Sequence, residues 1–283
     1  MSSKNYLSIY AKSFNWAGFF LPKKTYQKCS SLYDFCRTVD NIADDDGELD
    51  IKKKNLSNFK NDFITKNYNN IIIKNMWDLM NHHLISIKVV KDLFNGVDSD
   101  LNKKVEFENK KDLLIYSYRV AGTVGLMMAK ILNVKDQNSM RAAIDLGIAM
   151  QLTNIARDVV EDSNINRFYI KNDFETICNT LALADLFYKS SFTAIKQIPF
   201  KFRFAILVAR RVYKKIGDKI LRTRNMEAYN KAGKIYVNNI EKIFQTIFSI
   251  FDLITLLFVK QKNSHMNTEH FLINEEINLD ERI

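Results

Sequence analysis

The sequence predicts an all-α protein with a single domain. Glycine and proline, which interrupt helices, number only 8 and 2 among 283 residues, so turns should be few and helices long. Strand-like alternation and hairpin dipeptides are almost absent. No linker rich in proline, glycine or serine divides the chain. We therefore expect one domain over residues 1–283, with a loose polar tail from about residue 260.

The net charge of +10 would suit nucleic acid, anionic lipid or a phosphorylated substrate. Lysine, asparagine and isoleucine are enriched throughout, and no nucleic-acid motif is found, so no nucleic acid partner is expected. Three cysteines without metal or disulfide spacing fit a reducing interior. The N-terminus lacks an apolar signal core. We expect a cytoplasmic protein, or one peripheral to the inner face of the membrane.

Four helices are expected in the N-terminal part of the chain. The second carries Asp40 and Asp44, whose spacing of four places both carboxylates on one helix face, with Arg37 one turn before them. The others alternate between polar scaffold and apolar packing segments. The expected ranges are 6–20, 25–43, 51–68 and 71–94.

The next expected helix covers residues 112–132 and carries small residues. Its glycines superficially suggest a phosphate loop, but no strand precedes them and the lysine of that motif is missing. Ala121, Gly122 and Gly125 instead predict a smooth face that a neighbouring helix, or a bound apolar chain, can approach closely. Both interpretations are compatible.

The central predicted helix, residues 139–162, carries the most informative pattern. Its side-chain oxygens recur at helical offsets of three, four and four, on Gln151, Asn154, Asp158 and Asp162. Arg157, and Arg167 in the following loop, add positive charge. A solvated acidic face with ordinary ion pairs is the simpler explanation for one such row. The second row, on Asp40 and Asp44, favours magnesium ions that bind a polyanion between two helices.

Three helices should complete the fold, over residues 173–197, 200–224 and 234–259. The last is very apolar, but Gln245 and Asp252 interrupt its apolar run, which is too short for a membrane span. Two interpretations remain open: the helix fills the core, or it binds an anionic membrane surface reversibly.

These motifs resemble the squalene and phytoene synthase family of head-to-head prenyl transferases. The most specific match is QLTNIARDVVED, residues 151–162, and YDFCRTVDNIADDD, residues 33–46, is the second. SFxxA at 13–17 with Leu21-Pro22, YSYRVAGTVG at 116–125, and Tyr213 also match, in family order. The resemblance implies the isoprenoid synthase fold, a helical bundle around a central apolar cavity.

The resemblance also implies the site. Magnesium, or alternatively manganese, would be held by Asp40, Asp44, Asn154, Asp158 and Asp162. Catalysis would rest on the four aspartates with Arg37 and Arg157. The remaining substrate-binding residues would be Ser13, Phe14, Gly18, Tyr116, Ala121, Gly122, Gln151, Arg167, Tyr169, Tyr213 and Lys231, the last where the family usually has an arginine.

The family divides by substrate length. No nucleotide fingerprint is found, and the chain stops soon after its last core helix, without the C-terminal anchor of eukaryotic squalene synthases, so no NADPH is expected. Gly18, beside the SFxxA match, would leave pocket depth for a longer tail. The prediction is phytoene, made from two geranylgeranyl diphosphates via prephytoene diphosphate in carotenoid biosynthesis. The alternatives are a farnesyl diphosphate-using presqualene, dehydrosqualene or squalene synthase, and a non-catalytic assembly factor of the same fold.

Overall fold

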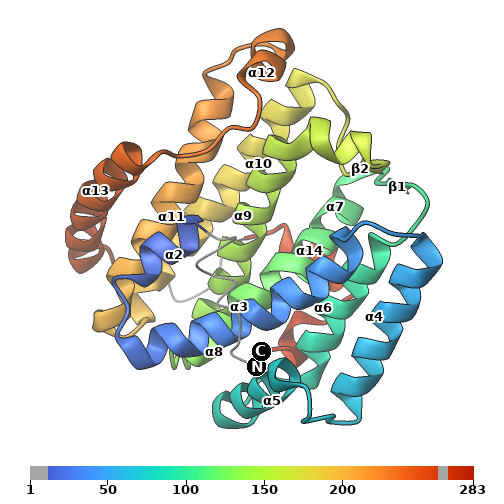
Figure 1. Ribbon diagram of the computed structural model, residues 1–283. Helices are drawn as coiled ribbons and strands as arrows, with labels where there is room; N and C mark the ends of the chain where they lie inside the picture. Colours follow the sequence, from blue (N-terminus) through green and yellow to red (C-terminus); the bar gives the residue numbers. More distant parts are fainter. Residues whose placement is uncertain (1–11, 261–266) are drawn as a thin grey trace.

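The computed structural model describes residues 12–260 and 267–283, without the side chains of Lys12 and Ser13. This part is a bundle of α-helices with two strands of two residues each, so the all-α prediction is confirmed (Figure 1). The helices are α2 (Lys12–Gly18), α3 (Lys23–Asp44), α4 (Leu49–Ile64), α5 (Ile71–His83), α6 (Ile87–Ser99), α7 (Lys110–Ser117), α8 (Thr123–Ile131), α9 (Gln137–Asn164), α10 (Phe174–Phe192), α11 (Phe200–Leu221), α12 (Met226–Ala232), α13 (Asn239–Phe258) and α14 (His270–Asn274).

Helix α9 is the central element, packed against α8, α10 and α11 (Figure 1). Its start is capped by Asp136, whose carboxylate accepts from the backbone N–H of Ser139 at 2.8 Å. The closest packing of α9 is against the backbone at Ala121, and it requires a glycine at position 147. A Cβ on Gly147 would lie 2.7 Å from the carbonyl carbon of Ala121. The small residues of the 112–132 segment thus serve helix packing, as one of the two interpretations predicted.

The apolar stretch 71–94, predicted as one helix, forms two helices instead. Leu84 adopts the left-handed conformation with φ of 52° and ends α5. Ser86 then caps α6, because its hydroxyl accepts from the backbone N–H of Lys88 at 3.2 Å. A strong local cap therefore outweighs continuous apolar periodicity.

The 112–132 segment also departs from a regular helix. Between α7 and α8 lies a single π-helical turn, η1 (Tyr118–Gly122), a distortion that often accompanies functional sites. The Tyr118 side chain is fully buried, and its hydroxyl donates to Asp92 Oδ2 at 3.1 Å.

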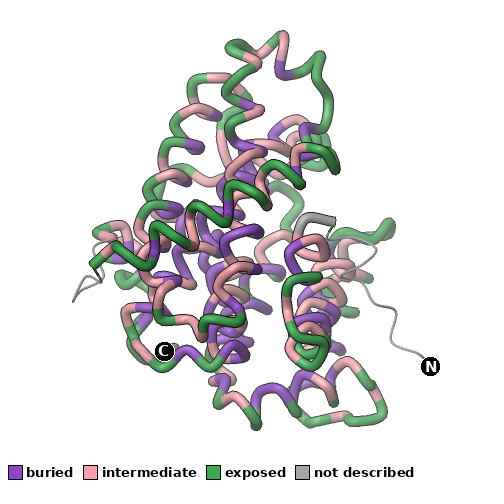
Figure 2. Tube along the Cα trace, turned by 90° about the vertical axis from the view of Figure 1, so that its left-hand side faces the viewer, coloured by how far each residue is buried: buried purple, intermediate pink, exposed green. Residues whose placement is uncertain are grey.

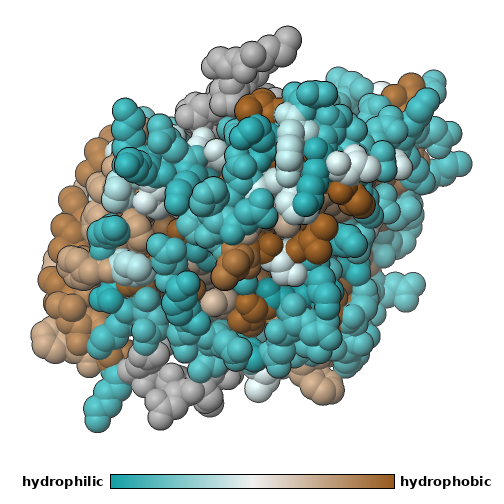
Figure 3. Space-filling model, turned by 90° about the horizontal axis from the view of Figure 1, so that it is seen from below, coloured by the Kyte–Doolittle hydropathy of each residue, from teal (hydrophilic) through white to brown (hydrophobic). Residues whose placement is uncertain are grey.

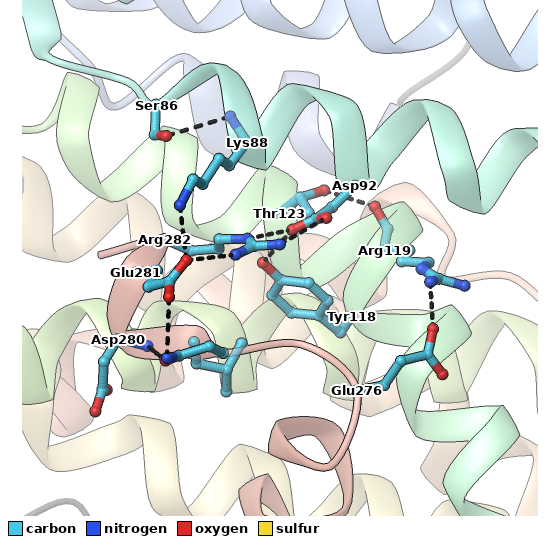
Figure 4. Close-up of polar contacts among 12 residues, drawn as sticks. Ser86, Lys88, Asp92, Tyr118, Arg119, Thr123, Glu276, Asp280, Glu281 and Arg282 are labelled. Carbon is cyan, nitrogen blue, oxygen red and sulfur yellow. Dashed lines mark hydrogen bonds and ion pairs between the residues drawn. The ribbon is translucent and has the colours of Figure 1, made fainter.

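The C-terminal tail was expected to be loose, and over residues 267–283 this is wrong. Ile273, Ile277 and Leu279 are buried in the core. Arg282 donates to both carboxylate oxygens of Asp92, at 2.9 and 3.3 Å, the same carboxylate that Tyr118 binds (Figure 4). The tail has a polar sequence, but its acidic residues pair with lysines and arginines of the bundle and this holds it in place. Glu276, for example, binds Arg119. Residues 261–266 lie outside the described part.

Replacing Arg282 by Gln is expected to lower the free energy of unfolding by about 3 kcal/mol, because it leaves the Asp92 carboxylate buried without its cation. Urea unfolding of the whole chain would measure this. Glu281→Gln is the matched control, since its solvent-exposed pairs with Lys88 and Arg282 should contribute little to stability. Equal stability of Arg282→Gln and the unmodified chain would show that this contact does not hold the tail.

Helix α13 lies on one side of the molecule and buries little of itself. Only Lys242, Ser249 and Leu256 of its twenty residues are buried. Figure 2 looks onto this side, and Figure 3 shows apolar residues gathered along the same edge. Among the described residues, no helix is both long and apolar enough to cross a membrane. The exposed apolar residues of α13 are Ile240, Ile243, Phe244, Ile247, Phe248, Ile250, Phe251, Ile254, Leu257 and Phe258.

Candidate functional site

A cavity of about 940 Å³ lies between α2, α3, α8, α9 and α11. One end is polar, with Arg37 and Asp40 from α3 and Gln151, Asn154 and Arg157 from α9. The remainder is lined mostly by apolar and small side chains. The cavity therefore has the two-part form that an anionic head with a long apolar tail requires.

The polar end joins the two acidic rows that the sequence predicted on separate helices. Arg167 links them to one another: its Nη1 lies 3.0 Å from Asp44 Oδ1, at the end of α3, although Arg167 follows α9 in the chain. The Arg167 side chain is only 12% exposed, whereas that of Asp44 is 43% exposed, so the pair is partly open to solvent. Arg37 adds a second cation 3.7 Å from Asp44 Oδ2.

Arg167 is placed by a short parallel pairing that the sequence did not predict. Strand β1 (Val105–Glu106) pairs with β2 (Arg167–Phe168). The backbone N–H of Val105 donates to the Asn166 carbonyl at 2.9 Å, and that of Phe107 to the Phe168 carbonyl at 3.2 Å. The loop after α9 is thus fixed to a segment some sixty positions earlier in the chain.

The electrostatics of the rows favour an added cation. Burial, and then the neighbouring Asp44 carboxylate, raise the pKa of Asp40 to about 7. Burial and then Asp158 likewise raise the pKa of Asp162 to about 7. A divalent cation would relieve the repulsion between these carboxylates and favour their ionised forms.

The donor set fits magnesium. Asn154 Oδ1 is buried without a hydrogen-bond partner in the described part of the chain, and it lines the cavity at the polar end. A buried acceptor left unpaired in this way is costly unless something binds it. Asn154 and the four predicted aspartates all offer oxygen, the donor type that hard cations prefer. Within the described ranges, no three His, Cys, Asp or Glu side chains converge on one point, so the carboxylates stand as separate groups.

Asp158 is held by cations of the protein itself. Arg157 binds it through Nε, 2.8 Å from Oδ1, and through Nη2. Lys234 Nζ lies 3.2 Å from the same Oδ1. Burial lowers the pKa of Arg157, but its hydrogen bonds to Asp158 outweigh this and raise the pKa above its ordinary value. These two cations are therefore placed to bind an anion at this row.

The cavity extends along α9. Ser139 and Asn154 both contact it, and the stretch of α9 between them is about 22 Å long at the usual helical rise. Small side chains of α9 close to Ser139, Ala142 and Ala143, also line it. Phe14 and Tyr213 contact the cavity with ring centroids 4.9 Å apart.

Nine of the residues predicted for the site line the cavity. They are Phe14, Gly18, Arg37, Asp40, Ala121, Gln151, Asn154, Arg157 and Tyr213. Asp44 and Arg167 stand beside Arg37 and Asp40, and Asp158 and Asp162 continue the α9 row. The side chain of Ser13 lies outside the described part.

Other predicted site residues are placed elsewhere. Tyr116 and Tyr169 are buried, stack with centroids 4.7 Å apart, and are not part of the cavity lining. Gly122 packs against Tyr118 and Ile144. Lys231 is exposed on α12, and the lysines that line the cavity are Lys234, in the coil after Gly233, and Lys242 on α13. Helical periodicity offered no signal for Lys234, because α12 ends at Ala232.

Gly18 contacts the cavity, but the space beside it is filled. A Cβ at Gly18 would lie 2.7 Å from the ring of Tyr26, which itself lines the cavity and donates its hydroxyl to Asn15 Oδ1 at 2.8 Å. The Tyr26 ring therefore reduces the extra pocket depth that was expected from the absence of a side chain at Gly18.

Comparisons with known proteins agree with this architecture. The squalene/phytoene synthase family matches residues 7–175. A 15-cis-phytoene synthase of a Paracoccus species is 36% identical over 168 residues, which cover 51% of this chain and 55% of that protein. The 15-cis-phytoene synthase of Pantoea ananas is 28% identical over 247 residues, covering 76% and 80% of the two chains.

Solved structures show the same fold. A dehydrosqualene synthase bound to a ligand superposes with a TM-score of 0.72 at 24% identity, over 88% of this chain and 94% of that one. The squalene synthase of Alicyclobacillus acidocaldarius gives 0.64 at 18% identity, over 79% and 91%. At these identities the likeness establishes the all-α isoprenoid synthase fold.

Proposed function

Because the chain belongs to the squalene/phytoene synthase family, we propose that it is a magnesium-dependent prenyltransferase that joins two geranylgeranyl diphosphates head to head. The product is phytoene, formed through prephytoene diphosphate, as a step of carotenoid biosynthesis. The observation that carries this proposal is one cavity whose polar end is lined by Arg37, Asp40, Asn154 and Arg157, with a mostly apolar remainder. Asp44, Asp158 and Arg167 pair with charged groups at or beside that end.

The cations at the polar end bind the diphosphate. Arg37, Arg157 and Arg167 supply charge-assisted hydrogen bonds to its oxygens, with Lys234 beside Asp158. Asp40, Asp44, Asn154, Asp158 and Asp162 would hold magnesium, or manganese, which would supply Lewis-acid neutralisation of the leaving group. The apolar walls keep water from the allylic cation that remains. The rings of Phe14 and Tyr213 present negative faces that stabilise positive charge.

The channel supports a four-isoprene tail. Small residues at its Ser139 end and the length of α9 along it leave room for an extended chain. The Tyr26 ring beside Gly18 reduces the space in the cavity at that point. This favours the runner-up, a farnesyl diphosphate-using presqualene, dehydrosqualene or squalene synthase.

Products from each substrate test the proposal. The purified chain is incubated with geranylgeranyl or farnesyl diphosphate, with magnesium or EDTA, and with or without NADPH. Phytoene from the C20 substrate, dependent on magnesium and indifferent to NADPH, is expected. Conversion of farnesyl diphosphate alone would replace the proposal with the runner-up, and no turnover of either would favour a non-catalytic assembly factor.

In the same assay Gly18→Phe should depress C20 use more than C15 use, because it displaces Tyr26 into the channel.

Lys234 rather than Lys231 is proposed to contact the diphosphate. Lys234→Gln is expected to raise the KM for substrate about fivefold, a modest loss because the side chain is more than half exposed. Lys231→Gln is the matched control and should leave KM unchanged, since Lys231 does not line the cavity. The reverse pattern in steady-state kinetics would return the role to Lys231.

We further propose that the protein binds a membrane surface through α13. An exposed apolar helix face of this extent marks an interaction site, and both the substrate tails and the product are lipid-soluble. Lys260 is exposed two residues after the end of α13, where Lys196 Nζ binds the Val259 carbonyl at 3.0 Å. Such lysines strengthen binding to anionic lipid. The apolar residues would lie at the acyl boundary without crossing the bilayer.

Flotation with anionic vesicles tests this surface. The chain should float, and replacing Phe244 and Phe251 by Glu should abolish flotation, because both side chains are more than half exposed on α13. Ile51→Glu is the matched control, an equally exposed apolar residue on α4, far from α13 (Figure 1). Absence of flotation would leave α13 without a lipid role. A dimer in solution that the double variant dissociates would instead make α13 an interface between two copies.

A further inference from the structure

The folded C-terminal tail contacts the π-helical turn η1 at two points (Figure 4). Arg282 donates to both oxygens of the buried Asp92 carboxylate, which also accepts from the hydroxyl of Tyr118, the first residue of the turn. Arg119 is the second residue of the turn, and its Nη2 lies 2.5 Å from Glu276 Oε1. The tail therefore binds the turn directly at one residue and through a buried carboxylate at another.

The hydrogen bonds of η1 show how a π-helical turn is stabilised from within. Such a turn holds one residue more than an α-helical turn and is rare, so its surroundings must favour it. The backbone N–H of Thr123, just after the turn, bonds to the Tyr118 carbonyl five residues earlier. Its hydroxyl donates to the Arg119 carbonyl at 2.7 Å. In an α-helix that carbonyl would accept from the Thr123 N–H, so the hydroxyl replaces the bond that the π-helical turn gives up.

The turn also forms part of the cavity wall. Val120 and Ala121, its third and fourth residues, line the cavity. Helix α6 packs closely on this turn, since a Cβ on Gly96 would lie 2.8 Å from a Val120 methyl group. If the turn relaxed to an α-helix, the residues before it would rotate by about 100° relative to those after it, the angle that one residue spans. The wall at Val120 and Ala121 would then change shape.

We propose that Arg282 and Glu276 are positioning residues that hold η1 in its π-helical form and so set the shape of the cavity wall. None of the described residues of the tail lines the cavity, so they act on it only through η1. The group affected is the apolar tail of the substrate, and in this the inference rests on the proposed function. Arg282 should contribute more than Glu276, because the Asp92 side chain is only 8% exposed. Without Arg282 that buried carboxylate would turn toward water and release Tyr118.

Hydrogen exchange of the η1 amides, and binding of the uncharged C20 alcohol geranylgeraniol by calorimetry, test this with the whole chain. Arg282→Gln should speed exchange in η1 and raise the Kd about fivefold, at a temperature where circular dichroism shows it folded. Arg282→Lys keeps the charge and should raise the Kd only about twofold. In a Tyr118→Phe background, Arg282→Gln should change the Kd less than about twofold, because the hydroxyl that joins Asp92 to the turn is already gone.

A matched pair of variants isolates the second contact. Glu276→Gln and Glu275→Gln each remove a partly exposed ion pair of the tail, but Glu275 binds Lys111 on α7, outside the turn. Glu276→Gln should speed exchange in η1, and Glu275→Gln should not.

Three outcomes would overturn the proposal: unchanged exchange and Kd in Arg282→Gln, equal losses in both backgrounds, or faster exchange in η1 shared by Glu275→Gln. Should Arg282→Gln fail to fold, Arg282→Lys carries the test, with its smaller loss again dependent on Tyr118. Neither readout involves turnover, so the result is separate from the proposed reaction. Faster exchange in η1, with no geranylgeraniol bound by the unmodified chain, would refute the prenyl channel and retain the positioning of the turn.

Discussion

Asp158→Asn and Asp40→Asn are each expected to reduce kcat by several orders of magnitude. Each replaces a charged oxygen that we propose as a magnesium ligand, in a different acidic row. A loss of about 3 kcal/mol of transition-state stabilisation already slows a reaction about 100-fold. Asp158→Asn also releases Arg157 and Lys234 from their shared carboxylate. Single-turnover kinetics at saturating magnesium would measure the effect.

Glu161→Gln provides the control for these variants. It lies on the same helix, exposed, three residues beyond Asp158 and outside the cavity lining. Its kcat should match that of the unmodified chain, and circular dichroism should show all three variants folded. Near-normal turnover by either aspartate variant would refute the two-row metal site.

Gly147→Ala is expected to destabilise the fold by about 3 kcal/mol, although alanine is the better helix former. The new Cβ would lie 2.7 Å from the Ala121 carbonyl carbon, closer still to its oxygen, and 3.0 Å from the Gly122 Cα. These are backbone atoms, which cannot rotate aside. Because Ala121 also lines the cavity, the shift should lower activity as well.

The matched control for Gly147→Ala is Gly217→Ala on α11. Its Cβ would meet only a methyl group of Leu181, at 3.1 Å, and a flexible side chain can yield. Chemical unfolding of this control should give a free energy within about 1 kcal/mol of the unmodified value. If Gly147→Ala proves as stable as Gly217→Ala, the contact between α9 and η1 is looser than these distances indicate.

The sequence by itself determined the fold class and the two acidic rows. Helical spacing alone places Asn154 and Asp158 on one face of α9, and Asp40 and Asp44 on one face of α3, because a helix repeats every 3.6 residues wherever it lies. Scarce glycine and proline gave the all-helical class for the same local reason.

Only the tertiary structure decided what stands between those rows. Lys234 reaches Asp158 from a coil, and Arg167 reaches Asp44 from the loop after α9, so neither pairing has a local pattern. The tail beyond residue 267 looked loose because its charges find their partners on distant helices, as Arg282 does on Asp92. Tyr116, expected in the cavity, stacks on Tyr169 instead. Spacing along a helix is a property of the chain, whereas pairing of charges and rings depends on which elements the fold brings together.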